Sequence, residues 1–199
     1  MGTDVSGFVE CRTRYGNGGW QAAIDLELLV DSRDYDAFGC LFGVRNHANF
    51  RPLAAGRGLP ADASAAVLAA REELPLYSDT TWIGWDELAA VDWDEPAEDT
   101  DSRIHQFRRT GQGLQYVGKA GWSARFAEAL GLTPPAPGEP RPTWPEGTEW
   151  QIGDTLYRSV RLTRRQAVGR KWQPLLALMA ALGGLHGAEN VRLVVWFDE

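Results

Sequence analysis

The final segment of the chain, VRLVVWFDE at residues 191–199, carries apolar side chains at both odd and even positions. Successive side chains of a β-strand point to opposite faces of its sheet, so a strand that is apolar at both sets of positions is buried on both faces. An interior strand of a layered fold meets that condition. We therefore expect residues 191–199 to lie inside a sheet, with the N-terminal strand in the same sheet.

In the rest of the chain, apolar residues have the spacing of strands in some segments and of helices in others. Strands are expected at residues 3–14 and 20–29, joined as a hairpin by the turn sequence YGNGG, and again within residues 148–163. Helices are expected at residues 33–42, 61–74 and 172–185, with another entered from a strand or turn at residues 81–91. The expected fold class is α+β, with a single mixed sheet formed by the N-terminal hairpin and the C-terminal strand, and with helices packed on it.

Local signals mark where the helices and loops begin and end. Asp31 or Ser32 is expected to cap the first helix, and Asp62 or Ser64 the second, which stops before Pro75. Residues 133–148 hold six of the eleven prolines, and proline removes backbone donors, so this stretch is expected to be a loop. The segment after it is too short to count as a separate domain. Residues 1–199 are therefore expected to form one α+β domain with a Pro-rich loop at 133–148.

Composition limits where the protein works and what it binds. No apolar run is long enough for a membrane span, and the N-terminus lacks a signal-peptide pattern, so a cytoplasmic protein without membrane contact is expected. Cys11 and Cys40 fit no zinc spacing and are expected to be free, buried thiols. The net charge of −7 argues against general nucleic-acid binding. No cofactor is expected, because the chain has no nucleophile elbow and no phosphate-binding P-loop.

Charge is unevenly distributed along the chain. Residues 86–101, the acidic tract, contain eight acids and no base, whereas residues 158–171, the basic tract, contain six bases and no acid. The first interpretation is two solvated surfaces of opposite sign. Two alternatives are that the acidic tract docks a basic partner, and that the basic tract holds an anion.

The opening segment MGTDVSGFVECR places polar residues on alternate positions of the first strand. Asp4, Ser6, Phe8 and Glu10 share one face by this alternation. Asp4 and Ser6 lie close enough to meet one ligand, but Asp4 and Glu10 lie about 20 Å apart, so one metal ion cannot take both. A lone Asp-x-Ser on a strand is also compatible with a purely structural role.

Five blocks of the sequence, in order, carry a resemblance to a known family. They are MGTDVSGFVE, DSRDYDAFGCLFGVRN, RGLPADAS, TWIGWDEL and VRLVVWFDE. Together they resemble an uncharacterised family of bacteriophage and prophage proteins whose N-terminus reads Met-Gly-Cys-Asp-Ile-His. The resemblance covers roughly residues 1–88 and 188–199. It implies a phage-associated origin, and the host cytoplasm as the site of action, but it implies no reaction.

This chain departs from the family at the positions where metal or acid–base chemistry would need imidazoles. Ser6 stands where the family has histidine, Thr3 where it has cysteine, and SDTT at residues 78–81 where it has His-Ser-x-Ser. Serine and threonine replace neither a neutral nitrogen ligand nor a general base near neutral pH. We therefore expect no metal site. Of the three histidines, only His47 is considered functional, while His105 and His186 are expected at exposed loop positions.

An arginine-rich loop at residues 45–57, after the first helix, is the main candidate site. Arginine forks match paired oxygens, so a loop of this kind beside a sheet suits an anionic ligand. The alternative is structural, with Arg45 closing the helix and pairing with Asp31 or Asp34. The expected ligand-binding residues are Asp4, Ser6, Tyr35, Arg45, Asn46, His47, Arg51 and Arg57.

Three functions remain open from the sequence. The preferred hypothesis is a non-enzymatic phage or prophage accessory protein, with counter-defence as a role considered, that binds a small anionic, nucleotide-like ligand or a host protein. The second is a hydrolase or transferase acting on a phosphate-containing substrate through Asp4, Asp34 and His47. The third is an acidic immunity or inhibitor protein whose acidic tract covers a basic surface.

Overall fold

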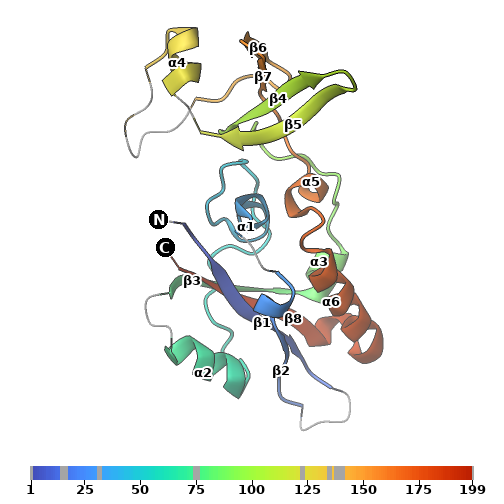
Figure 1. Cartoon of the computed structure of the whole chain (residues 1–199). Helices are drawn as coiled ribbons and strands as arrows, with labels where there is room; N and C mark the ends of the chain where they lie inside the picture. The colour runs from blue at the N-terminus through green and yellow to red at the C-terminus, as the bar shows by residue number, and fades with distance from the viewer. Residues whose placement is uncertain are drawn as a thin grey trace.

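The computed structural model describes residues 2–13, 18–30, 33–73, 77–121, 124–133, 136 and 142–198. The α+β class is confirmed, but the strands form two four-stranded antiparallel sheets instead of one mixed sheet. Figure 1 shows the two sheets at opposite ends of the molecule, with α1 (Tyr35–Phe42) and α5 (Arg164–Val168) between them. The position of the expected YGNGG turn lies largely outside the described residues.

The first sheet has the strand order β2-β1-β8-β3. Its strands are β1 (Val5–Cys11), β2 (Gln21–Asp25), β3 (Tyr77–Gly84) and β8 (Val191–Asp198). The C-terminal strand β8 pairs with β1 on one side and with β3 on the other, so the expected interior position is confirmed. The expected N-terminal hairpin is also present, because β1 and β2 pair antiparallel.

Helices cover both faces of the first sheet (Figure 1). One face packs against α1 and α6 (Gln173–His186) in the main core, to which β8 contributes Leu193, Val195 and Phe197. The other face packs against α2 (Ala65–Glu73) through a small cluster of Val67, Val194 and Trp196. Burial on both faces explains why β8 is apolar at every position between its ends except Arg192.

A glycine allows β1 and β8 to approach closely. A Cβ atom at Gly7 would lie 2.1 Å from the carbonyl oxygen of Val194, far inside van der Waals contact. Any side chain at this position forces the two strands apart. The close approach fixes the register in which Gly7 faces Val195.

The helix starts agree in part with the expected caps. Asp34 caps α1, its side chain accepting a hydrogen bond from the backbone N–H of Ala37, and the expected caps Asp31 and Ser32 lie outside the described residues. At the start of α2, the hydroxyl oxygen of Ser64 accepts a hydrogen bond from the backbone N–H of Val67. Pro174 lies in the first turn of α6. Pro75 also lies outside the described residues. The remaining helical elements are α3 (Trp85–Ala89) and two 3₁₀ turns at Leu26–Leu28 and Ala188–Asn190.

The second sheet has the strand order β5-β4-β7-β6 and was only half expected. Its strands are β4 (Ile104–Thr110), β5 (Gly113–Ala120), β6 (Glu149–Ile152) and β7 (Thr155–Arg158). The strand region predicted at 148–163 is the β6–β7 hairpin, but the β4–β5 hairpin was not predicted. His105, expected in an exposed loop, lies in β4 with 6% of its surface exposed, so that expectation is wrong.

A small aromatic core supports the second sheet. Phe126 of α4 (Ala124–Leu130) packs against Ile104 and Tyr157 on one face of the sheet. Trp144, in the C-terminal part of the Pro-rich stretch, joins this core, with its ring centroid 5.8 Å from that of Phe126. The described part of that stretch is therefore a loop packed against the sheet.

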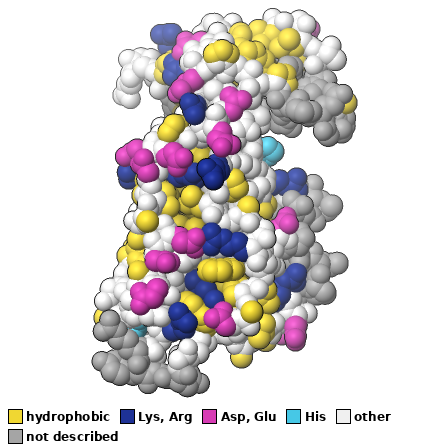
Figure 2. All heavy atoms as spheres, turned by 180° about the vertical axis from the view of Figure 1, so that it is seen from behind, with side chains coloured by type: hydrophobic (Ala, Val, Ile, Leu, Met, Phe, Trp, Pro, Cys, Tyr) yellow, Lys and Arg dark blue, Asp and Glu magenta, His cyan; other side chains and the backbone are white. Residues whose placement is uncertain are grey.

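The acidic and basic tracts are the two connections between the sheets, and they lie side by side. The backbone N–H of Ala97 donates to Leu162, and that of Arg164 donates to Glu95. Arg164 and Arg165 also form ion pairs with Glu95 and Asp94. Figure 2 shows acidic and basic side chains interleaved down the molecule instead of gathered into areas of one sign. The two tracts therefore do not form separate surfaces, because Glu95 and Asp94 of the acidic tract pair with bases of the basic tract.

Candidate functional site

The polar face of the first strand makes buried contacts with other parts of the fold. Glu10 is fully buried and pairs with Arg192, whose Nε lies 2.7 Å from Glu10 Oε2. The other oxygen of Glu10 accepts the backbone N–H of Ser64, and Arg192 also pairs with Asp62 at 2.7 Å. These contacts tie β1 and β8 to the start of α2. Glu10 is thus a structural residue.

Asp4 lies at the exposed end of the same face and is held by an arginine. Both carboxylate oxygens of Asp4 accept hydrogen bonds from Arg33, at 2.6 and 2.7 Å. These hydrogen bonds lower the pKa of Asp4 below its ordinary value. Asp4 therefore remains an anion near neutral pH, already paired, and is unsuited to act as a proton acceptor there. Ser6 lies two residues further along β1, opposite Trp196 of β8.

Three of the expected ligand-binding residues do converge near the N-terminus. Tyr35 accepts the backbone N–H of Thr3 through its hydroxyl oxygen at 3.2 Å. Arg45 donates from Nε to the hydroxyl of the fully buried Thr3 at 2.9 Å. The His47 ring packs edge-on to Tyr35, with 6.2 Å between ring centroids. These contacts anchor the loop after α1 to the first strand.

The remaining residues of the arginine-rich loop also have structural contacts. The side chain of Asn46 bridges the backbone N–H and C=O of Phe50, which shapes the loop. Arg57 makes a two-pronged ion pair with Glu87, at 2.8 and 2.7 Å, and lies over the ring of Trp82. Arg51 is exposed, and its carbonyl oxygen accepts from Arg164. The expected pairing of Arg45 with Asp31 lies outside the described residues and stays a prediction, whereas Asp34 uses its carboxylate to cap α1.

The residues proposed for catalysis each have a structural contact of their own. Asp34 uses its carboxylate to cap α1, and burial raises its pKa above the ordinary value. Asp4 is paired with Arg33, and within the described part of the chain no hydrogen bond or ion pair links any two of Asp4, Asp34 and His47. The described residues also contain no group of three or more His, Cys, Asp or Glu side chains placed to share a metal ion.

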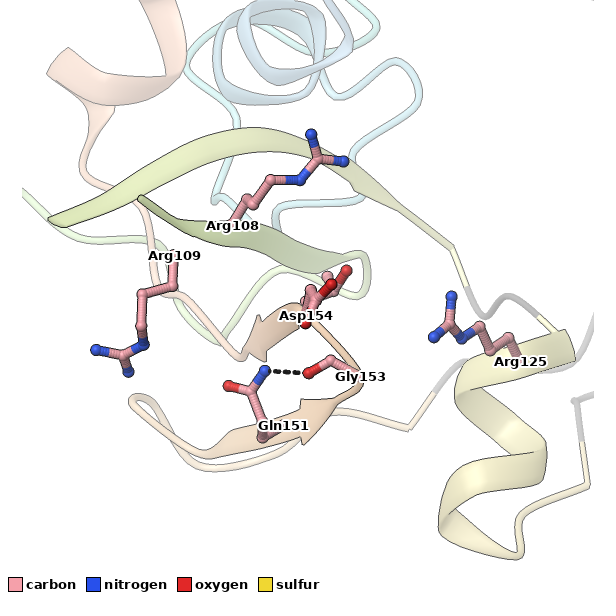
Figure 3. A pocket seen from close by; sticks show the side chains of 7 residues that line it. Arg108, Arg109, Arg125, Gln151, Gly153 and Asp154 are labelled. Atoms are coloured by element: carbon pink, nitrogen blue, oxygen red, sulfur yellow. Dashed lines mark hydrogen bonds between the residues drawn. The ribbon is translucent and has the colours of Figure 1, made fainter. Parts of the chain in front are cut away.

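A different cluster of arginines surrounds a pocket at the far end of the second sheet. The pocket has a volume of about 480 Å³, and we call it the arginine pocket. It is lined by Arg108, Arg109, Arg125, Gln151, Gly153, Asp154 and Thr155. Figure 3 shows Arg108 and Arg125 on two sides of the turn at Gly153 and Asp154, and Arg109 on the other side of β4. Three guanidinium groups and one carboxylate give the pocket a positive charge.

The arginines of this pocket differ from most others in the chain. Ion pairs with carboxylates engage Arg33, Arg57, Arg103, Arg158, Arg164, Arg165 and Arg192. By contrast, the guanidinium groups of Arg108, Arg109 and Arg125 make no hydrogen bond or ion pair with any described residue. An unpaired guanidinium offers a planar set of N–H donors that matches phosphate and carboxylate oxygens.

The local sequence explains how the pocket is formed. Gly153 adopts a left-handed conformation with φ of 58°, which suits glycine, in the short turn between β6 and β7. The side-chain amide of Gln151 donates to the carbonyl oxygen of Gly153 at 2.6 Å and steadies the turn, as Figure 3 shows. A Cβ atom at Gly153 would lie 2.9 Å from Nη2 of Arg125, so this guanidinium lies close over the turn.

The arginine pocket was not predicted, although the sequence contains a signal for it. Residues 102–127 include five Arg or Lys residues and no acid, directly after the acidic tract. Two of these bases, Arg103 and Lys119, form ion pairs with Asp101 and Asp36. The other three are the arginines of the pocket.

Comparison of the chain with protein-family models, with curated proteins and with solved structures gives no match. None of the helices in the described ranges has the length and apolar character needed to cross a bilayer. The geometry of the pocket therefore provides the basis for a functional assignment.

Proposed function

We propose that this protein is a non-enzymatic binding protein for a phosphate-bearing anion, and that the arginine pocket is its binding site. The observation that carries the proposal is a set of three guanidinium groups around one pocket, none of which has a carboxylate partner among the described residues. Bound phosphate oxygens would accept charge-assisted hydrogen bonds from Arg108 and Arg125, which lie on one side of the sheet.

The contrast with the net charge supports the proposal. The chain as a whole carries −7, so its overall field repels anions, and a local positive site is needed to bind one. The arginine-rich loop at residues 45–57 is a weaker candidate, since Arg57 is neutralised by Glu87 and Arg45 donates to Thr3. The resemblance to phage and prophage proteins favours an accessory role in a host cell, and that role is part of this proposal.

The proposed role is binding, because most of the side chains around the pocket cannot transfer a proton near neutral pH. Its side chains are three arginines, one amide, one hydroxyl and Asp154. Arginine stays protonated across the physiological range, so it stabilises charge without transferring protons. Asp154 adjoins the anion site, where its charge opposes binding instead of assisting it.

Isothermal titration calorimetry with tripolyphosphate tests the proposal. Arg108→Gln and Arg125→Gln should each weaken binding roughly ten- to a hundredfold, because each removes a charge-assisted hydrogen bond. Asp154→Asn should tighten binding roughly threefold, since it removes one negative charge at the site.

The matched control is Arg165→Gln. This change removes the same positive charge from an exposed arginine that pairs with Asp94, in the basic tract outside the pocket. It should leave the affinity for tripolyphosphate within about twofold. Equal losses in Arg165→Gln and Arg108→Gln would show that only net charge matters and would overturn the proposal.

A further inference from the structure

A second pocket lies on the same sheet, beside the arginine pocket. It has a volume of about 450 Å³, and we call it the ring pocket. One wall is formed by His105, Phe107 and Tyr116 from β4 and β5, and another by Val160 and Leu162 from the segment before α5. Clefts of this size, largely apolar with few polar groups, suit a small organic molecule.

The aromatic wall of the ring pocket is already arranged for stacking. The rings of Phe107 and Tyr116 lie 5.7 Å apart between centroids, and those of His105 and Tyr116 lie 5.8 Å apart. Tyr116 nonetheless has 51% of its surface exposed, although large apolar rings are favourably covered. The side chains of this wall therefore present an uncovered aromatic surface toward the cleft.

Polar groups at the ring pocket would recognise the edges of a flat heterocycle. His105 is buried, and its Nε2 lies 3.4 Å from Asp101 Oδ2, so the ring orientation is fixed from behind. Glu146, on the Pro-rich loop, is exposed at the pocket and offers carboxylate oxygens to N–H donors. Arg158 lies over Phe107 at 5.0 Å and pairs with Glu149, which holds the wall in place.

The two pockets are neighbours along β4. Side chains alternate along a strand, so Phe107 of the ring pocket and Arg109 of the arginine pocket point to the same face. Same-face positions of a strand lie about 7 Å apart. Arg108 points to the opposite face, so a ligand in the ring pocket approaches the arginine pocket on the side of Arg109. A chain of two or more phosphates attached to a flat ring is long enough to reach Arg109.

We infer that the ring pocket binds the base of a nucleotide-like ligand whose phosphate groups occupy the arginine pocket. This inference rests on the proposed function and specifies its ligand class: a heteroaromatic base joined to two or more phosphates. The same chemistry occurs in free nucleoside di- and triphosphates and at the 5′-phosphorylated end of an oligonucleotide. Stacking on the exposed ring of Tyr116 supplies affinity for the base, and the guanidinium groups supply affinity for the phosphates.

Calorimetry without divalent cations tests the inference by comparing tripolyphosphate with ATP, GTP, CTP and UTP. At least one nucleotide should bind the wild-type protein roughly five- to a hundredfold more tightly than tripolyphosphate, as base stacking predicts. Tyr116→Ala should remove that advantage and leave tripolyphosphate binding unchanged, and Tyr116→Phe should retain it. Phe107→Ala serves as a second variant should Tyr116→Ala fail to fold.

The same calorimetric experiment distinguishes a free nucleotide from an oligonucleotide as the source of the ligand. A free nucleotide as ligand predicts that a 5′-triphosphorylated trinucleotide binds no more tightly than the mononucleotide. An oligonucleotide as ligand predicts a clear gain. In both cases an unphosphorylated trinucleotide should bind at least tenfold more weakly than its phosphorylated form.

Failure of this inference is distinguishable from failure of the proposed function. If tripolyphosphate binds and Arg108→Gln weakens it, but no nucleotide binds more tightly, the inference is overturned and the anion site stands. If neither tripolyphosphate nor any nucleotide binds, both are overturned. Equal weakening of tripolyphosphate and nucleotides in the Tyr116→Ala protein would also overturn the inference, because it would indicate a general structural effect.

Discussion

The first sheet and the far end of the second sheet use their arginines in opposite ways. Around the first sheet, Arg192 pairs with buried Glu10, Arg33 with Asp4 and Arg57 with Glu87. At the far end of the second sheet, Arg108 and Arg125 have no carboxylate partner among the described residues. Charges that are paired hold a fold together, whereas unpaired charges of one sign are available to a ligand. The comparison therefore supports a scaffold role for the first sheet and places the proposed binding site at the far end of the second.

The charged residues between the two sheets are paired with one another, as they are in the first sheet. Asp101 is buried and receives Arg103 and Lys119, which both also pair with Asp36 of α1. Burial disfavours the charged carboxylate, but the hydrogen bonds from His105 and Arg103 and the charge of Lys119 prevail and hold the pKa of Asp101 below its ordinary value. The network fastens the second sheet to α1, so the ligand site is held on a rigid base.

The largest effect is expected from breaking the buried pair of the first sheet. Arg192→Leu leaves the buried carboxylate of Glu10 without its ion-pair partner, which costs about 3–5 kcal/mol of unfolding free energy. Urea unfolding measures this cost. Arg33→Gln breaks an exposed pair and should change the unfolding free energy far less than the loss of the buried pair. Similar costs for the buried and exposed pairs would contradict the assignment of the scaffold.

A smaller effect is expected at the network between the sheets. Asp101→Asn should lower the unfolding free energy by about 1.5–3 kcal/mol, the range for hydrogen bonds to charged groups. Because the folded-state pKa of Asp101 is depressed, its stabilising contribution is complete above about pH 5 and is lost as the pH falls below about 4. The wild type should therefore lose more stability than Asp101→Asn between pH 5 and pH 3, and equal losses would refute the role of Asp101.

Arg57→Gln sharpens the comparison between the two arginine groups. The Arg57–Glu87 pair is partly exposed, so its loss should lower the unfolding free energy by about 1 kcal/mol. Affinity for tripolyphosphate should stay the same, because the guanidinium is already engaged. A tenfold loss of affinity would return the arginine-rich loop to consideration as the binding site.

The smallest effect on stability is expected at the arginine pocket itself. Arg108→Gln and Arg125→Gln should change the unfolding free energy by no more than about 0.5 kcal/mol, since neither side chain pairs with a residue in the described ranges. Thermal unfolding monitored by circular dichroism checks this. A loss of several degrees in melting temperature would mean that these residues support the fold.

Elements with a strong hydrophobic period were predictable from the sequence. The strand β8 is apolar on both faces, and α6 repeats apolar residues at helical spacing, so both were found. The β4–β5 hairpin was missed because its segments, IHQFRRT and GLQYVGKA, mix exposed polar residues, glycines and isolated aromatics. That pattern reflects a sheet with an exposed edge strand, whose residues are not selected for burial.

The candidate site was harder to predict than the fold. Arg45 and Arg57 appeared available because their partners, Thr3 and Glu87, lie 42 and 30 residues away in the chain. Whether an arginine is paired depends on contacts of this kind, which neither composition nor spacing reveals. The acid-free run at residues 102–127 was visible in the sequence, but it became meaningful only once Arg103 and Lys119 were seen to be paired and Arg108 was not.

The most direct test maps the ligand site on the whole protein by titrating ¹⁵N-labelled protein with tripolyphosphate and following the backbone amide resonances. The account predicts that the largest shifts fall at the end of β4, at the Gly153–Asp154 turn and around Arg125. Amides of the loop at residues 45–57 and of the N-terminal strand should shift little. Shifts concentrated in that loop and strand, with the second sheet unaffected, would contradict the account.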